Sequence, residues 1–168
     1  GILGIGLIGG SMALDLKKSG WAKKCIGIDT GRKNQQRALE LGLIDELKPL
    51  EVALKELTVL IIAVPVDNLV AALPEILNKL NPNQVVIEVG STKTPIYEAI
   101  KNHPKRTQFV STHPMAGTEF SGPEAAFEGL FKNKRAVICD EELSDVDLVK
   151  RIEDLYQTGL GMNLIYID

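Results

Sequence analysis

The chain has 168 residues, of which 45% are hydrophobic and 24% are charged. These values are typical of one globular domain with a buried core, and they exclude two large domains, a disordered chain and a fibrous repeat. The formal net charge of −3 provides no basic surface for a phosphodiester backbone, so we expect no nucleic-acid partner.

Two further features narrow the class of protein. The longest strongly apolar run, residues 59–66, contains Pro65 and is far shorter than the about 20 residues of a membrane span, so we expect no membrane partner. Cys25 and Cys139 are far apart and form no Cys-x-x-Cys pair, so neither a disulfide framework nor a zinc site is indicated. We therefore expect a cytoplasmic protein.

Apolar, β-branched runs alternate with segments of helical period, which is the pattern of a parallel sheet with helices on both faces. In chain order the pattern predicts a strand at 2–5, a helix at 9–19, a strand at 25–28, a helix at 33–41 ended by Gly42, a strand at 59–64, a helix from Asp67 to Leu80, a strand at 85–89, a helix at 95–102 and a strand at 108–111. Residues 112–131 follow neither period and are interpreted as a long functional loop. A strand at 136–139, a helix at 145–156 and a strand at 163–168 complete the prediction.

No internal repeat or low-complexity linker divides the chain, so residues 1–168 are expected to form one domain. Gly1 already begins an apolar strand, and another strand closes the sequence. We therefore expect the chain to be a piece of a longer protein.

The segment Gly4-Ile5-Gly6-Leu7-Ile8-Gly9 follows a predicted strand and begins a predicted helix, which is the context that the dinucleotide fingerprint requires. Gly4 makes the tight turn, Gly6 leaves room for a pyrophosphate, and Gly9 allows close packing of the helix on the strand. Free N–H groups at the start of the predicted helix favour the phosphates, and Leu7 and Ile8, between the glycines, are predicted cofactor contacts. The pattern indicates a Rossmann-type, doubly wound α/β domain with a mainly parallel sheet.

Asp29 ends the second predicted strand about 20 residues after the last of these glycines, where a carboxylate accepts hydrogen bonds from both ribose hydroxyls of NAD. The same carboxylate repels the 2′-phosphate of NADP, although Arg32 and Lys33 are near enough to attract it. We therefore favour NAD over NADP as the cofactor. Val64 and Pro65 end the central strand at the ligand edge of the sheet and are predicted cofactor contacts, with a plain strand stop as the alternative for Pro65.

Ser91 lies in the turn Glu88-Val89-Gly90-Ser91-Thr92-Lys93, at the carboxyl end of another predicted strand. The turn matches neither a phosphate-binding P-loop nor a nucleophile elbow. On this pattern alone, Ser91 is interpreted as a helix cap rather than a catalyst.

His113 is the candidate acid or base. It follows a strand and precedes Pro114, so its backbone is extended, and an imidazole exchanges protons near neutral pH. A structural histidine in the loop is the alternative. His103 lies among basic residues and is interpreted as an exposed helix end. Two histidines and two scattered cysteines indicate no metal site.

Together these segments resemble the prephenate/arogenate dehydrogenase family of tyrosine biosynthesis over essentially the whole chain. The discriminating run is His113-Pro114-Met115-Ala116-Gly117-Thr118-Glu119 followed by Ser121-Gly122, after the glycine fingerprint and the Gly90-Ser91-Thr92-Lys93 turn. The resemblance implies an NAD-dependent oxidative decarboxylation of prephenate, in which His113 accepts the proton of the ring 4-hydroxyl and Ser91 orients that hydroxyl. It places Thr118 and Glu119 at the mouth of the substrate site.

The resemblance also implies an all-helical second domain that forms a homodimer and supplies an arginine for the substrate carboxylate. That region is not among the 168 residues, and Arg106, Arg135 and Arg151 match no motif of the family. Three alternatives stay open: an arogenate dehydrogenase, a non-catalytic dinucleotide-binding module, and another dehydrogenase of this fold that acts on a hydroxy acid or an imino acid.

Overall fold

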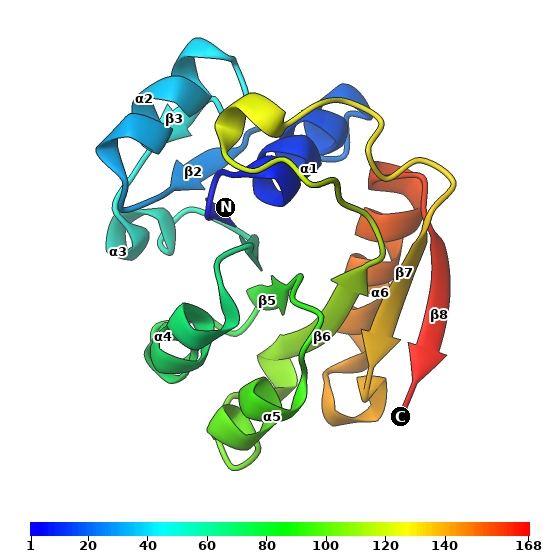
Figure 1. Cartoon of the computed structure of the whole chain (residues 1–168). Coiled ribbons are helices and arrows are strands. Elements are labelled where there is room, and N and C mark those ends of the chain that lie inside the picture. The colour runs from blue at the N-terminus through cyan, green and yellow to red at the C-terminus, as the bar shows by residue number, and fades with distance from the viewer.

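The computed structural model describes all residues, 1–168, and builds them on an eight-stranded sheet with strand order β3-β2-β1-β4-β5-β6-β7-β8 (Figure 1). The strands are β1 (Ile2–Leu3), β2 (Ile26–Ile28), β3 (Glu46–Leu47), β4 (Val59–Ile62), β5 (Val85–Glu88), β6 (Phe109–Pro114), β7 (Arg135–Cys139) and β8 (Asn163–Ile167). The first six run parallel, β7 is antiparallel to β6, and β8 is parallel to β7. The predicted doubly wound, mainly parallel α/β fold is confirmed, with its switch point between β1 and β4.

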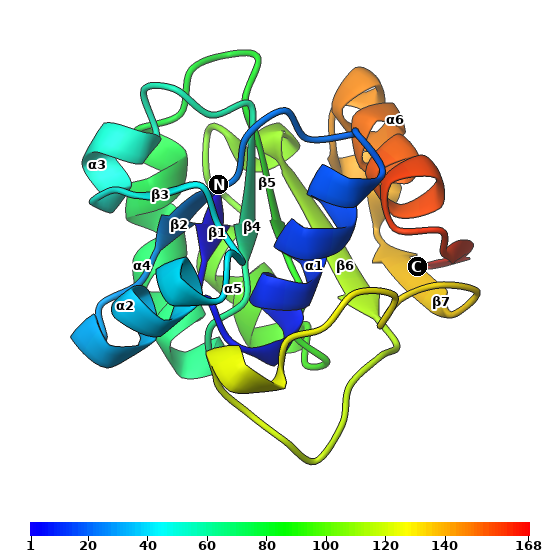
Figure 2. The ribbon, with the colours of Figure 1, turned by 90° about the horizontal axis from the view of Figure 1, so that it is seen from above.

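The sheet is covered on both faces because its strand residues alternate between two apolar clusters. In β4, Val59 and Ile61 belong to one cluster, while Leu60 and Ile62 belong to the other. The helices are α1 (Leu7–Lys18), α2 (Arg32–Glu40), α3 (Leu50–Ala53), α4 (Val66–Asn78), α5 (Thr94–Ile100) and α6 (Val146–Asp154). The first cluster lies under α1, α2 and α6, and the second lies under α3, α4 and α5 (Figure 1, Figure 2).

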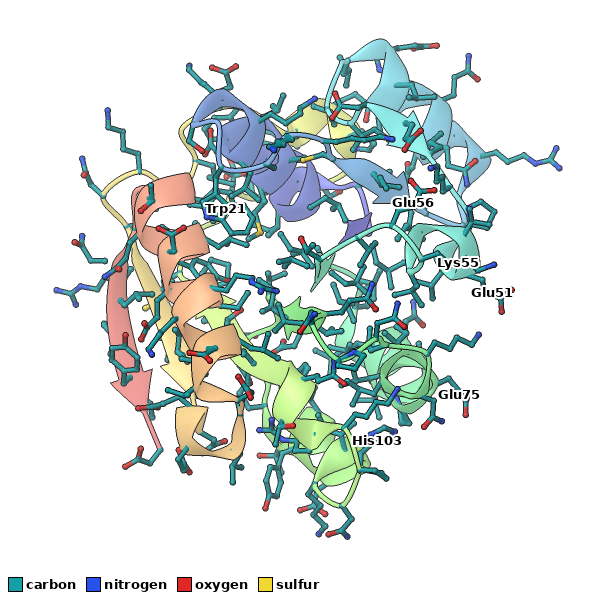
Figure 3. The ribbon with its side chains drawn as sticks, turned by 180° about the vertical axis from the view of Figure 1, so that it is seen from behind. Trp21, Glu51, Lys55, Glu56, Glu75 and His103 are labelled. Carbon is teal, nitrogen blue, oxygen red and sulfur yellow. The ribbon has the colours of Figure 1, made fainter.

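Short helical turns complete the chain. Three are 3₁₀ turns, η1 (Arg106–Gln108), η2 (Pro123–Ala125) and η3 (Glu141–Leu143), and one is a π-turn, η4 (Leu155–Gly159), directly after α6. Trp21, which follows α1, donates a 2.7 Å hydrogen bond to Asp154 at the end of α6, so the two helices are also joined at this end of the sheet (Figure 3). None of the helices has the length and apolar character that crossing a membrane requires.

The first residues of α6 and α4 are capped in different ways. Asp145 caps α6 and accepts the N–H groups of Asp147 and Leu148 at 2.9 and 3.2 Å. Asp67 does not cap α4, because Pro65 occupies the cap position and its carbonyl accepts the N–H of Leu69 at 3.1 Å. Asp67 instead lies in the first turn of the helix, where its negative charge favours the helix dipole.

Two elements were not predicted from the sequence. β3 has two residues, and its pairing of Glu46 with Ile26 comes from the neighbouring strand rather than from any alternation of its own. α3 has four residues, too few to show a helical period. Both follow from tertiary contacts of the segment between α2 and β4.

The prediction of a loop beginning at residue 112 is wrong at its start. β6 continues through Pro114, because β7 pairs with it from the far side and opposes His113 to Val137. His113 is therefore a strand residue near the carboxyl end of β6. The irregular segment begins at Met115, arches away from the sheet and returns through η2 to β7 (Figure 2).

Candidate functional site

The turn between β1 and α1 depends on glycine at two positions. Gly4 has φ +92°, and a Cβ added there would lie 2.6 Å from the carbonyl oxygen of Ala63 on β4's extension. A Cβ on Gly9 would lie 2.1 Å from the carbonyl oxygen of Gly4, which closes the turn under the helix. Any side chain at these positions would push α1 off the sheet.

Gly6 has the opposite surroundings. A Cβ added there would meet nothing nearer than the amide nitrogen of Gly122, at 4.0 Å. The N–H groups of Leu7 and Ile8 begin α1 and have no acceptor in the protein. Space above Gly6 and free donors at the positive end of the α1 dipole fit a pyrophosphate group.

Asp29 fastens this turn to the end of β2. Its two carboxylate oxygens accept the N–H groups of Ile5 and Gly31 at 3.1 and 2.8 Å, and the residue remains half-buried. Each oxygen keeps a further lone pair for a hydroxyl. The carboxylate is therefore held at the position where a ribose diol of a dinucleotide would reach it.

A cleft of about 690 Å³ opens beside Asp29. It is lined by Leu3, Gly4, Ile28, Asp29, Thr30, Gln35, Leu47, Lys48, Pro49, Leu50, Val64, Asn68 and Ala72. Val64 lines this cleft, whereas Pro65 is outside the lining and occupies the cap position of α4. The segment 47–50 was missed, since only the pairing of β3 with β2 brings it to the cleft.

Arg32 and Lys33 begin α2 just beyond Asp29, and both are exposed. Neither makes a hydrogen bond or an ion pair within the chain. They are solvated residues of a helix start.

His113 stands at the carboxyl end of β6, on the same edge of the sheet as the glycine turn. Its Nδ1 lies 3.3 Å from the carbonyl oxygen of Val89 at the end of β5. A carbonyl only accepts, so Nδ1 is the donor in this contact, and in a ring that carries one proton Nε2 is then the acceptor.

Ser91 lies in the turn after β5, exposed and without a hydrogen-bond partner in the chain. Its interpretation as a helix cap is wrong, because α5 begins at Thr94 and its cap position is Lys93. The hydroxyl of Ser91 is thus uncommitted at the end of the strand next to His113.

Sequence reasoning gave no role to the charged pair beneath this turn. Glu88 is fully buried, and its carboxylate contacts the ammonium of Lys93. Glu88 also accepts from Gly90 N–H at 2.8 Å and from the hydroxyl of Ser111 at 3.1 Å. A glutamate inside an otherwise apolar strand run was the only signal that could have drawn attention to it.

Thr118 and Glu119 lie on the arching segment, exposed to solvent. Thr118 Oγ1 accepts the N–H of Phe120 at 3.2 Å, and both residues line a second, shallow hollow of about 710 Å³ with Phe120 and Phe127. Neither makes a hydrogen bond to His113. The structure therefore leaves these two residues apart from the dinucleotide cleft.

Hydrogen bonds join the end of the irregular segment, at Phe127 and Gly129, to helix α1. Ser11 Oγ accepts the N–H of Phe127 at 3.0 Å, and Asp15 Oδ1 accepts the N–H of Gly129 at 2.7 Å. Burial raises the pKa of Asp15, and the hydrogen bond from Gly129 opposes that rise. The segment after β6 and the helix of the glycine turn are therefore packed as one unit.

A glycine turn closed on β4, free donors at the start of α1, and a carboxylate at the end of β2 together define a dinucleotide-binding domain of the Rossmann class. Residues 12–164 match the family described as prephenate dehydrogenase, nucleotide-binding domain, and the chain belongs to that family.

Proteins similar to this chain include prephenate and arogenate dehydrogenases. A prephenate dehydrogenase of Bacillus subtilis is 36% identical over 170 residues, which cover 99% of this chain and 45% of that protein. The solved structure of arogenate dehydrogenase from Synechocystis superposes with a TM-score of 0.83 at 27% identity, covering 98% of this chain and 58% of that one. The structure of prephenate dehydrogenase from Aquifex aeolicus in complex with hydroxyphenyl propionate and NAD+ gives the same score, identity and coverage. The chain spans about half the length of the curated relatives it matches.

Proposed function

We propose that this chain is the cofactor domain of an NAD-dependent prephenate dehydrogenase, which converts prephenate to 4-hydroxyphenylpyruvate. The observation that carries the proposal is the imidazole of His113, held through Nδ1 by Val89 at the sheet edge that also carries the glycine turn. That contact leaves Nε2 as the acceptor for a hydroxyl proton.

In this proposal His113 is the general base. Nε2 accepts the proton of the ring 4-hydroxyl while the hydrogen on the same carbon leaves as hydride, and the hydroxyl of Ser91 orients the substrate oxygen. Bound NAD supplies the hydride acceptor. Loss of the ring carboxylate as carbon dioxide then returns its bonding electrons to the ring, which becomes aromatic. One positioned proton transfer contributes about 10²–10⁴-fold to such a rate.

Several residues are proposed cofactor contacts. Gly6 gives the pyrophosphate room, Leu7 and Ile8 donate to it, and Asp29 accepts from the adenosine ribose, with Val64 lining the cleft. Gly4 and Gly9 shape the turn rather than touch the ligand. Pro65 is proposed only as the residue next to Val64 in the chain, without a side chain in the cleft. Thr118 and Glu119 are proposed to approach the substrate when it is bound.

The rest of the protein is proposed from the length of its relatives. Residues 1–168 would form one domain, followed by a helical domain that forms a homodimer in the cytoplasm and supplies the arginine for the substrate carboxylate. Arg106 does not suit that role, because it is buried and donates to the carbonyl of Phe109 at 2.8 Å.

An arogenate dehydrogenase is the second candidate, supported by the Synechocystis neighbour. It differs in the side chain of the substrate, which carries an amino group in place of the keto group. The exposed Arg32 and Lys33 beside the ribose position also make NADP the alternative cofactor.

The first experiment is NADH formation by the full-length protein, with prephenate and L-arogenate supplied in parallel and NADP tested beside NAD. Turnover of prephenate with NAD supports the proposal, and turnover of arogenate selects the second candidate. Binding of NADH with no turnover of either acid refutes both and leaves a dinucleotide-binding module.

A further inference from the structure

β5 and β6 separate at the edge of the sheet where His113 and Ser91 lie. Their backbone ladder ends with the pair Glu88 and Ser111. Beyond it, β6 continues against β7, while β5 turns away at Val89. The relative position of the two proposed catalytic side chains is therefore not set by strand pairing.

Side chains replace the ladder beyond this point. The N–H of Thr112 donates to the Glu88 carboxylate at 3.3 Å, and the carbonyl of Thr112 accepts from Lys93 Nζ at 2.5 Å. The hydroxyl of Thr112 donates to the backbone carbonyl of Glu88 at 2.6 Å. Thr112 is the residue before His113. Its N–H, its carbonyl and its hydroxyl all face β5, and each makes a hydrogen bond that involves a side chain.

The same two charged residues hold the turn before Ser91. Gly90 donates its N–H to Glu88 at 2.8 Å, and its carbonyl accepts from Lys93 at 2.7 Å. Val89, whose carbonyl accepts from the His113 ring, lies between these fixed points. The Glu88–Lys93 pair therefore joins the turn that carries Ser91 to the strand that carries His113.

Neither charged group is free to bind a ligand. An ammonium has three N–H donors, and those of Lys93 go to Glu88, Gly90 and Thr112. The Glu88 side chain is 0% exposed. Its Oε1 accepts from Lys93, Ser111 and Thr112, and its Oε2 accepts from Gly90. A pair that is bonded and enclosed in this way serves neither as an acid or base nor as a substrate anchor.

We propose that the Glu88–Lys93 pair is the positioning element of the reaction, which holds the His113 ring and the Ser91 hydroxyl in mutual register across the gap between β5 and β6. This inference rests on the proposed function. Removing one partner leaves a buried charge without its counter-charge, so the turn and the strand end move apart. A displacement of about 1 Å at a catalytic base lowers turnover by about 100-fold.

The test compares variants in the full-length protein. Lys93→Met is expected to lower kcat about 100-fold, with the Kd for NADH unchanged within about twofold, because β4 separates the strand of the glycine turn from the strand of Glu88. Lys93→Arg keeps the cation and is expected to recover part of kcat. The matched control is Lys101→Met, which removes an exposed 2.7 Å ion pair with Glu98 at the end of α5 and should leave kcat unchanged.

A second measurement reads the ring directly. Nitrogen NMR of His113, assigned by comparison with His113→Asn, should show the proton on Nδ1 in the parent protein and a mixture of both ring forms in Lys93→Met. This readout needs no turnover, so inactivity of the parent on both acids refutes the proposed function without deciding the positioning role. If Lys93→Met does not fold, the near-isosteric Glu88→Gln replaces it, with the same expectations. Unchanged kcat and an unchanged ring form in a folded variant would overturn the inference.

Discussion

The two halves of the site are built in different ways. Around Gly4, Gly6 and Gly9 the site consists of backbone, of donors left free at a helix start, and of space where side chains are missing. Around Glu88 and Lys93 it consists of a buried carboxylate and a half-buried ammonium, which bind each other and the backbone of Gly90 and Thr112. Both halves lie at the carboxyl ends of the parallel strands, the first after β1 and β2 and the second after β5 and β6.

The difference shows what each half is sensitive to. The glycine turn depends on volume, since an added methyl group collides with backbone at Gly4 and Gly9 and enters open space at Gly6. The charged half depends on balance, since the loss of one partner leaves the other uncompensated. Substitutions in the first half should therefore change binding or folding, and those in the second should change turnover.

The largest effect on this comparison is expected from His113→Asn. Removal of the proton acceptor should lower kcat about 10²–10⁴-fold while NADH binds as before. Steady-state kinetics and a fluorescence titration of NADH measure the two quantities. His103→Asn is the matched control, because His103 contacts Asn78 beside α4 and α5, outside the site (Figure 3). Retained turnover in His113→Asn would assign the base elsewhere and favour a binding module.

The glycine turn is tested by a pair of methyl insertions. Gly9→Ala places a Cβ 2.1 Å from the Gly4 carbonyl and should cost about 1–3 kcal/mol of unfolding free energy. In Gly6→Ala the added Cβ has no protein atom closer than 4.0 Å, so the free energy of unfolding should be unchanged. The affinity for NADH should fall by about tenfold or more. Denaturant unfolding and ligand titration separate the two outcomes. Equal affinity of Gly6→Ala and the parent would show that no pyrophosphate lies above Gly6.

Cofactor choice is expected to change more modestly. Asp29→Ser removes the carboxylate that accepts from Ile5 and Gly31, and the ratio of NAD to NADP activity should fall by about tenfold. Asp29→Asn, which keeps the shape and one acceptor oxygen, should lie between the two. Parallel kcat/KM values for both cofactors measure the ratio. A ratio unchanged in both variants would show that Asp29 serves the turn alone.

The smallest effect concerns a buried carboxylate that lacks a partner like Lys93. Asp15 on α1 accepts one N–H from Gly129, its Oδ2 has no partner, and burial raises its pKa. Because the folded state disfavours the charged form, it binds the Asp15 proton more tightly than the unfolded chain does. The free energy of unfolding therefore falls as pH rises through the pKa of Asp15 in the folded protein.

Asp15→Asn should therefore raise the unfolding free energy at pH 7 by up to about 1 kcal/mol, and the gain should disappear below the ordinary carboxyl pKa. Denaturant curves at pH 3 and pH 7 measure it. The exposed Asp147→Asn is the control, with an expected change within about 0.5 kcal/mol. A gain that is independent of pH would show that the charge of Asp15 is not the cause.

Features that are local in the chain could be predicted from the amino-acid sequence. The alternation of apolar runs predicted the parallel sheet, the spacing of Gly4, Gly6 and Gly9 predicted the dinucleotide turn, and Asp145 predicted the start of α6. Each rests on a few neighbouring residues whose backbone conformation or period is specified by their own chemistry.

Other features depend on contacts between distant parts of the chain. β3 is too short to have a period, and its pairing with β2 brings residues 47–50 to the cleft. His113 became a strand residue because β7 pairs with it from a distant part of the chain. Lys93 reaches the carbonyl of Thr112 across the gap between two strands, and a buried charge of this kind is balanced by partners that no local pattern reveals.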